Sequence, residues 1–200
     1  MPGRGRHNRR MGRLALLAAS LAALAVPSLA LAELPAGAVA PDFTAQSAMA
    51  GKIESFNLRA ALRRGPVVLY FFPKAFTQGC TLETRAFAEA MDQFQAAHAT
   101  VIGMSADDLP TLQRFSTEEC RGKFAVAAAT PAIVRAYDVA MQREKLPQAM
   151  QGRIQPGLTG RTSYVIAPSG RITFVHSDLD YRDHVRLTLE AVQALGHHRH

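Results

Sequence analysis

Cys80 is the residue of this chain best placed to act as a nucleophile. It follows a run of β-branched and aromatic residues, 67–72, that predicts a strand buried on both faces. Pro73 ends that run, and from Thr81 onward apolar residues recur with a helical spacing. Cys80 therefore falls in the first turn of a helix, where unpaired backbone N–H groups and the helix dipole stabilise negative charge. This position favours the thiolate, which is the reactive form of cysteine.

Two neighbours of Cys80 fit the same chemistry. Thr77, three residues earlier, can turn its hydroxyl toward the sulfur or toward a substrate oxygen, and Pro73 can form an apolar wall against water. A lone cysteine is otherwise most often a small buried hydrophobic residue. The proline, threonine and cysteine together favour a reactive thiol over that alternative.

Pro73, Thr77 and Cys80 resemble the P-x-x-x-T-x-x-C active-site motif of the peroxiredoxins. The GCTLE run at 79–83 and the APDFT run at 40–44 resemble the peroxiredoxin Q group, also called bacterioferritin comigratory proteins, and the similarity continues to about Leu195. RTSYVIAPSGRI at 161–172 resembles the strand pair that supplies the active-site arginine of that family, which is Arg161 here.

The resemblance implies a peroxidase that needs no cofactor or metal. Cys80 would attack a hydroperoxide and become a sulfenic acid, while Arg161 and Thr77 stabilise the charge that develops on the leaving oxygen. A second cysteine would then form a disulfide, and a thioredoxin-like or other external dithiol would reduce it. The resemblance also leads us to expect a monomer.

The second cysteine is not where many members of the group carry it. That position, five residues after Cys80, is occupied by Arg85, and the only other cysteine is Cys120. Cys120 resembles the resolving cysteine of a second arrangement in the group, on the following helix. The alternatives are a structural Cys80–Cys120 disulfide and a one-cysteine enzyme in which Cys120 is only a buried side chain.

The spacing of apolar residues predicts alternating strands and helices in one α/β domain over residues 33–200. Asn57 is expected to cap a short helix that ends at Arg64. We predict strands at 67–72, 100–105, 124–127, 162–166 and 171–176, and longer helices at 80–98, 109–120, 131–137 and 181–195. The fold that the resemblance implies is a thioredoxin-like sandwich, with a central mixed sheet flanked by helices.

The first 32 residues read as a signal peptide. Residues 1–13 hold five arginines and no acidic residue, residues 14–29 are almost entirely alanine and leucine, and Ala30-Leu31-Ala32 forms a small-x-small cleavage pattern before Glu33. An uncleaved membrane anchor is the alternative, which Pro27 and the cleavage pattern disfavour. We expect a periplasmic or secreted protein with no stable membrane association after cleavage, exported by either the general or the twin-arginine route.

Removal of this leader changes the charge of the chain. The leader carries five of the 23 basic residues and none of the 16 acidic ones, so the formal net charge falls from +7 to +2. The rest of the sequence has no basic stripe interleaved with aromatic residues, and no nucleic-acid partner is indicated.

Several other features have a less specific interpretation. The polar segment 141–160 either edges the active site or is a tolerated surface insertion. His184 and the other internal histidines read as structural or surface residues, and the C-terminal histidines as a frayed tail rather than a metal site. Glu83 reads as a helix-start acid that favours the dipole and can pair with a base, rather than as a proton-transfer group. A thioredoxin-fold redox sensor stays the alternative function, although Cys80 lacks the nearby second cysteine of that class.

Overall fold

A computed structural model describes Met1 and residues 33–146, 148–152 and 157–197. The predicted signal peptide and the last three residues lie outside this described part. The strands are β1 (Thr44–Met49), β2 (Lys52–Asn57), β3 (Val67–Phe71), β4 (Thr100–Ser105), β5 (Ala125–Ala128), β6 (Thr162–Ile166) and β7 (Ile172–Ser177). The helices are α1 (Leu58–Leu62), α2 (Gln78–Ala96), α3 (Leu109–Glu118), α4 (Pro131–Tyr137), α5 (Gln148–Gln151) and α6 (His184–His197), with a 3₁₀ turn, η1 (Arg143–Lys145).

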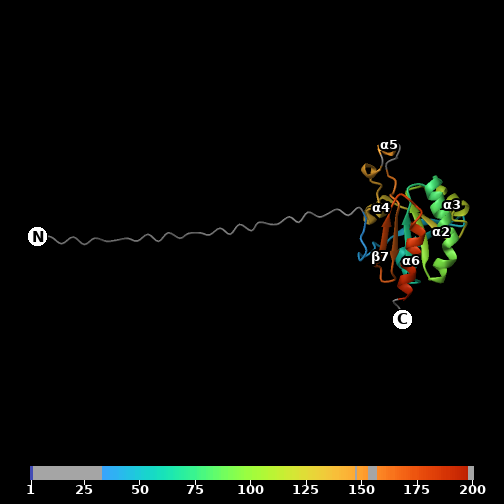
Figure 1. The fold of residues 1–200 in the computed structure, drawn as a ribbon, viewed down its shortest axis with the longest axis horizontal. Helices are drawn as coiled ribbons and strands as arrows, with labels where there is room; N and C mark the ends of the chain where they lie inside the picture. Colours follow the sequence, from blue (N-terminus) through green and yellow to red (C-terminus); the bar gives the residue numbers. More distant parts are fainter. Residues whose placement is uncertain (2–32, 147, 153–156, 198–200) are drawn as a thin grey trace. The chain divides into compact units, whose positions relative to one another are not determined.

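The strands form one mixed seven-stranded sheet in the order β2-β1-β5-β4-β3-β6-β7 (Figure 1). β3, β4 and β5 run parallel to one another, whereas β1 and β6 join this centre in the antiparallel direction. Parallel neighbours need a crossover, and α2 and α3 supply those between β3 and β4 and between β4 and β5. The sheet therefore brings the start of α2 beside the start of β6.

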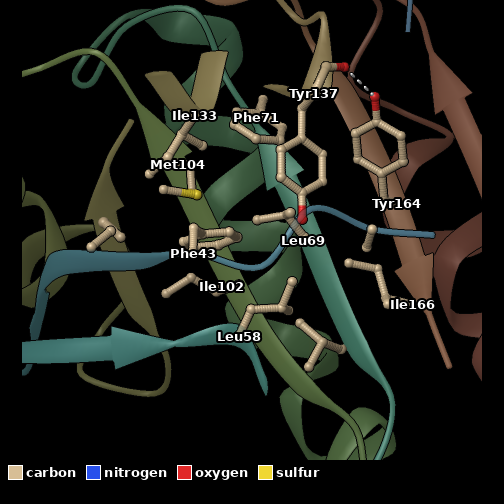
Figure 2. Close-up of a cluster of buried hydrophobic side chains, with 14 of the residues drawn as sticks. Phe43, Leu58, Leu69, Phe71, Ile102, Met104, Ile133, Tyr137, Tyr164 and Ile166 are labelled. Atoms are coloured by element: carbon tan, nitrogen blue, oxygen red, sulfur yellow. Dashed lines mark hydrogen bonds between the residues drawn. The ribbon is translucent and has the colours of Figure 1, made fainter. Parts of the chain in front are cut away.

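Successive residues of β3 point to opposite faces of the sheet and divide the core into two layers. Val67, Leu69 and Phe71 pack with α1 and α4, in the layer that Figure 2 shows around Tyr137 and Tyr164. Val68 and Tyr70 pack on the other face, with α2, α3 and α6. Every residue of β3 is fully buried, as its unbroken apolar sequence predicts.

Most predicted elements are confirmed with small shifts of their ends. β4, α4 and β6 have the predicted bounds, and the Asn57 side chain caps α1 by accepting a hydrogen bond from the Ala60 N–H. α2 starts two residues earlier than predicted, at Gln78, and α3 ends two residues earlier, at Glu118. Cys120 therefore lies in the turn after α3 rather than at the end of the helix.

The β1–β2 hairpin was not predicted from the sequence. β1 consists mainly of alanine, serine and glutamine, and β2 is an edge strand whose first four residues are exposed. Each strand has a single β-branched residue, Thr44 or Ile53, and the apolar residues that β1 buries are the small Ala45 and Ala48. Neither strand therefore carries the alternation of large apolar residues that marks a strand in a sequence.

The two ends of the segment 141–160 pair with each other beside the end of the central strand β3. Met141 and Gly160 donate backbone hydrogen bonds to the carbonyls of Leu158 and Val139, and Thr159 Oγ1 donates to the Phe72 carbonyl at 2.7 Å. Within the described residues, no helix is both long and apolar enough to cross a membrane.

Candidate active site

Cys80 is the third residue of α2, and its side chain is buried, with 1% exposed. Thr77 has the extended backbone of an N-cap residue, but its side chain caps no N–H group of the helix. Its hydroxyl instead donates to the Lys74 carbonyl oxygen at 2.8 Å. The Thr77 oxygen can still accept a hydrogen bond. Pro73 is half-buried in the loop between β3 and α2.

Arg161 reaches Cys80 from the residue just before β6. Its guanidinium donates in three directions: Nη2 to Cys80 Sγ at 3.5 Å, Nε to the Leu179 carbonyl at 3.0 Å, and Nη1 to Glu83 Oε2. These three acceptors fix the plane of a side chain that is only 6% exposed. The structure thus brings together Arg161 and Cys80, which lie 81 positions apart in the sequence.

Gly79 leaves the space that this arginine occupies. A Cβ atom at Gly79 would lie 3.2 Å from Arg161 Nη2 and 4.0 Å from Tyr181 Cδ1. The first of these distances is a tight contact, so a larger residue at position 79 would push the guanidinium from its place. The glycine before Cys80 is therefore explained by the close approach of Arg161.

Glu83, one turn after Cys80, is fully buried beside the same arginine. Burial raises the pKa of this carboxyl to about 8, although the charge and hydrogen bond of Arg161 oppose the rise. Burial also opposes the charge of Arg161, but Glu83 and Cys80 outweigh it and raise the pKa of the guanidinium.

Burial favours the neutral form of the Glu83 carboxyl, whereas the charge of Arg161 favours its ionised form. Burial outweighs the attraction of Arg161 and keeps the pKa of Glu83 raised, since Glu83 Oε1 has no hydrogen-bond partner to stabilise a full negative charge. One guanidinium therefore faces two buried acids, Cys80 and Glu83. The pairing of Glu83 with a base is confirmed, whereas its role as a helix-start acid is not, because α2 begins at Gln78 and has no acidic residue in its first turn.

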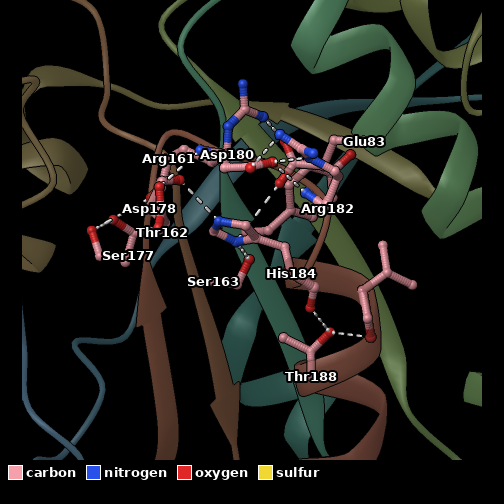
Figure 3. Close-up of polar contacts among 12 residues, drawn as sticks. Glu83, Arg161, Thr162, Ser163, Ser177, Asp178, Asp180, Arg182, His184 and Thr188 are labelled. Carbon is pink, nitrogen blue, oxygen red and sulfur yellow. Dashed lines mark hydrogen bonds and ion pairs between the residues drawn. The ribbon is translucent and has the colours of Figure 1, made fainter. Parts of the chain in front are cut away.

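His184 completes the buried polar group, as Figure 3 shows, between Ser163 and the Arg161–Glu83 pair. Its Nε2 lies 3.0 Å from the Asp178 carbonyl, which can only accept, so Nε2 carries the proton and Nδ1 accepts from the Ser163 hydroxyl at 2.7 Å. Burial lowers the pKa of His184 to about 4.

His184 Nδ1 is 3.8 Å from Glu83 Oε1. We predicted a structural or surface role for His184, and the structure buries it next to the candidate site. Ser163 follows Arg161 by two residues, so period-two alternation puts both on one face of the sheet. No sequence signal connects His184 itself to that face.

Cys120 lies in the same buried layer as Cys80, and both cysteines are free thiols. Burial, and then the neighbouring Glu119 carboxylate, raise the pKa of the Cys120 thiol well above its usual value. The Tyr70 hydroxyl is within electrostatic reach of both thiols, and burial followed by Cys120 raises its pKa. The two cysteines thus share one core layer without a bond between them.

A cavity of about 420 Å³ adjoins Arg161 at the edge of the sheet. Met141, Leu146 and Gly160 line it together with Leu179. The ends of segment 141–160 therefore border the candidate site. Among the described residues, no group of three or more histidine, cysteine or acidic side chains could hold a metal ion.

The model of the AhpC/TSA family matches residues 36–175, which include Cys80, Cys120 and Arg161. The chain belongs to the AhpC/TSA family. It is 29% identical over 160 residues to the chloroplastic peroxiredoxin Q of Triticum aestivum, covering 80% of this chain and 67% of the relative. It is 27% identical over 128 residues to peroxiredoxin Bcp of Xanthomonas campestris pv. campestris, covering 64% of this chain and 76% of the relative.

The fold is also that of solved peroxiredoxin structures. Peroxidoxin BcpB of Mycobacterium tuberculosis superposes with a TM-score of 0.68 at 24% identity, over 80% of this chain and 97% of that one. The predicted thioredoxin-like sandwich and the resemblance to the peroxiredoxin Q group are confirmed. The protein is a peroxiredoxin peroxidase.

Proposed function

We propose that this peroxiredoxin reduces hydrogen peroxide and organic hydroperoxides with Cys80 as the nucleophile. The observation that carries the proposal is the contact of Arg161 Nη2 with the buried Cys80 Sγ, 3.5 Å away at the start of α2. A fixed positive charge and a helix start then act together on one sulfur in a site that largely excludes water.

The first step breaks the O–O bond of the hydroperoxide. The Cys80 thiolate attacks the terminal oxygen, the S–O bond forms, and the other oxygen leaves as an alkoxide or hydroxide that takes up a proton to become an alcohol or water. The Arg161 guanidinium can stabilise the negative charge on the leaving oxygen, and Thr77, whose own proton is held by Lys74, can accept a hydrogen bond from the peroxide.

Cys120 resolves the sulfenic acid in this proposal. Its thiol condenses with the Cys80 sulfenic acid, one water leaves, and a Cys80–Cys120 disulfide forms. Both side chains lie in one core layer, but both are almost fully buried, with 1% and 0% exposed. In this proposal, as the resemblance to the peroxiredoxin Q group implies, the two sulfurs meet after local opening of the first turn of α2 or of the turn that carries Cys120.

A thioredoxin-like or other dithiol then restores the two thiols by disulfide exchange. The sequence pattern of residues 1–32 supports export, which would place the enzyme in the periplasm or outside the cell. The dithiol would then have to be available in that compartment.

The test is turnover of hydrogen peroxide by residues 33–200 with a supplied dithiol, for which dithiothreitol and thioredoxin are suitable. Cys80→Ser should abolish peroxide consumption. Cys120→Ser should react once, then stall as a sulfenic acid and overoxidise as the peroxide concentration rises. Full turnover of Cys120→Ser with thioredoxin would mean a one-cysteine enzyme, and full turnover of Cys80→Ser would refute the proposal.

A further inference from the structure

Three ion pairs connect the middle of α2 to the turn that carries Cys120. They are Arg85–Glu119 at 2.5 Å, Glu89–Arg121 at 3.5 Å and Asp92–Lys123 at 3.8 Å. The α2 members are spaced four and three residues apart and so lie on one face of the helix, and the turn members alternate along the chain. We call this set the ion-pair ladder.

The first pair of the ladder differs from the other two in geometry and burial. Arg85 donates to both carboxylate oxygens of Glu119, from Nε at 2.5 Å and from Nη2 at 3.2 Å. The three bases are about equally exposed, at 45% for Arg85, 50% for Arg121 and 44% for Lys123, but Glu119 is only 10% exposed whereas the other two acids are 65% and 86% exposed. Exposed pairs contribute little, so Arg85–Glu119 is the pair whose loss matters.

This pair joins the two segments that must move relative to each other for a disulfide to form. Arg85 is on the helix of Cys80, five residues further along, and Glu119 is the residue just before Cys120. The Cys120 N–H is bonded to the Phe115 carbonyl.

The residue after Cys120, Arg121, has φ +52°, in the left-handed region that side chains rarely adopt. Backbone hydrogen bonds from Gly122 to the Ser116 carbonyl and from Lys123 to the Cys120 carbonyl hold this turn together, so it can move as one unit. The Arg85–Glu119 pair is the side-chain contact that joins this turn to the helix of Cys80, at the residue next to Cys120.

We propose that the Arg85–Glu119 pair is a latch that sets how fast Cys120 reaches the Cys80 sulfenic acid. While the pair is closed, Cys120 stays buried; when it opens, the turn swings out and the thiol condenses with the sulfenic acid, forming the S–S bond and releasing water. Arg85 and Glu119 are positioning residues, since neither touches the reacting atoms. This inference rests on the proposed role of Cys120.

The latch also decides how easily the enzyme is overoxidised. A Cys80 sulfenic acid that waits for Cys120 can react with a second peroxide and become a sulfinic acid. The fraction of enzyme that is overoxidised depends on the rate of this second oxidation relative to the rate of disulfide formation. A slower opening of the latch therefore makes Cys80 more sensitive to high peroxide.

The experiment follows disulfide formation in residues 33–200 after one equivalent of hydrogen peroxide, by rapid acid quench, alkylation and mass spectrometry. Arg85→Gln and Glu119→Gln should each accelerate the Cys80–Cys120 disulfide by about tenfold, because each removes a charge-assisted bidentate pair. Sodium chloride at 1 M should accelerate the wild type and leave Arg85→Gln unchanged. Arg186→Gln, which breaks exposed ion pairs on α6, is the matched control and should leave the rate of disulfide formation unchanged, with or without the salt.

Two further readouts separate the latch from a loss of stability. The peroxide concentration that overoxidises half of Cys80 should rise about tenfold in Arg85→Gln. In the Cys120→Ser background the same substitution should leave that concentration unchanged, because no resolution remains to be accelerated.

Unchanged disulfide rates in both latch variants would overturn the latch and leave the proposed function standing. Slower disulfide formation, or slower oxidation of Cys80 itself in Arg85→Gln, would also overturn it, because the pair would then guide Cys120 or support the active site. No disulfide in the wild type would overturn both the latch and the proposed role of Cys120.

Discussion

Replacing Arg161 by methionine should separate what this residue does for the reaction from what it does for the fold. Methionine keeps part of the buried stem and removes the three donors. Of these, only Nη2 touches the reacting atom, Cys80 Sγ, at 3.5 Å. Loss of one preorganised donor to developing charge typically lowers a rate by about 10²–10³, or about 3–4 kcal/mol of activation free energy. We expect this loss in the rate of Cys80 oxidation.

The loss of stability in Arg161→Met has a different cause from the loss of rate, and a second substitution should reverse part of it. Without Arg161, the Leu179 carbonyl loses its donor, at about 1–3 kcal/mol. Glu83 also becomes an unpaired buried carboxylate, at about 3–5 kcal/mol when ionised. Beside Arg161 the pKa of Glu83 is about 8, and removal of the guanidinium, which lowers that pKa, raises it further. At pH 6 the carboxyl is neutral in both proteins, whereas near pH 9 only the wild type gains the stability of an ionised, paired carboxylate, so the loss should be larger at pH 9 than at pH 6. The double variant Arg161→Met/Glu83→Gln should recover stability at pH 9 but not the rate.

The chain contains no tryptophan, so Cys80 oxidation is best followed by rapid quench, alkylation and mass spectrometry. Stability is measured by urea unfolding of the same samples. Arg161→Lys is the control for charge alone: one ammonium cannot reach all three acceptors, and its rate should fall between wild type and Arg161→Met. The reasoning is refuted if Arg161→Met, while folded, keeps a rate within about fivefold of wild type, or if the double variant regains it.

Three further predictions concern buried groups of the same layer. Burial raises the pKa of Glu83 from 4.5 to about 8, so the folded chain keeps a proton that the unfolded chain releases, and urea stability should fall as pH rises between these values; Glu83→Gln should remove this slope. Burial lowers the pKa of His184 from 6.5 to about 4, so stability should fall as pH drops through that interval, and His184→Asn should remove this loss. If the pH dependence persists in Glu83→Gln or in His184→Asn, a different group causes it. A Cβ at Gly103 would lie 2.7 Å from the Tyr70 ring, so Gly103→Ala should cost at least about 1–3 kcal/mol in urea unfolding, whereas Gly196→Ala, with open space around it, should not destabilise; equal effects would contradict the tight packing.

The central part of the fold could be predicted from the sequence because its signals are local. The all-apolar β3 and the helical spacing after Cys80 identify a buried strand and the following helix directly. Asn57 and Pro131 mark the starts of two helices by capping and by a fixed backbone angle. The β1–β2 hairpin lacks such signals, since the apolar residues that β1 buries are small alanines and most of β2 is exposed.

In the candidate site, too, the residues that form a local sequence motif could be predicted, and those brought together by tertiary contacts could not. Cys80, Thr77 and Pro73 are close in sequence and form a motif, and Arg161 was reached only through a family resemblance. The burial of Glu83 against Arg161 and His184 depends on how α2, β6 and α6 meet, which residue spacing does not encode. The Arg85–Glu119 pair is likewise a tertiary contact between residues 34 positions apart.

The most direct test of the account is the rate at which Cys80 reacts with hydrogen peroxide in the Cys120→Ser variant of residues 33–200. Stoichiometric peroxide should add one oxygen to Cys80. The second-order rate in the folded protein should exceed that of the same variant unfolded in urea by at least about 10², the contribution of a preorganised charge-stabilising site. Equal rates in the folded and unfolded chains would contradict the claim that α2 and Arg161 activate this cysteine.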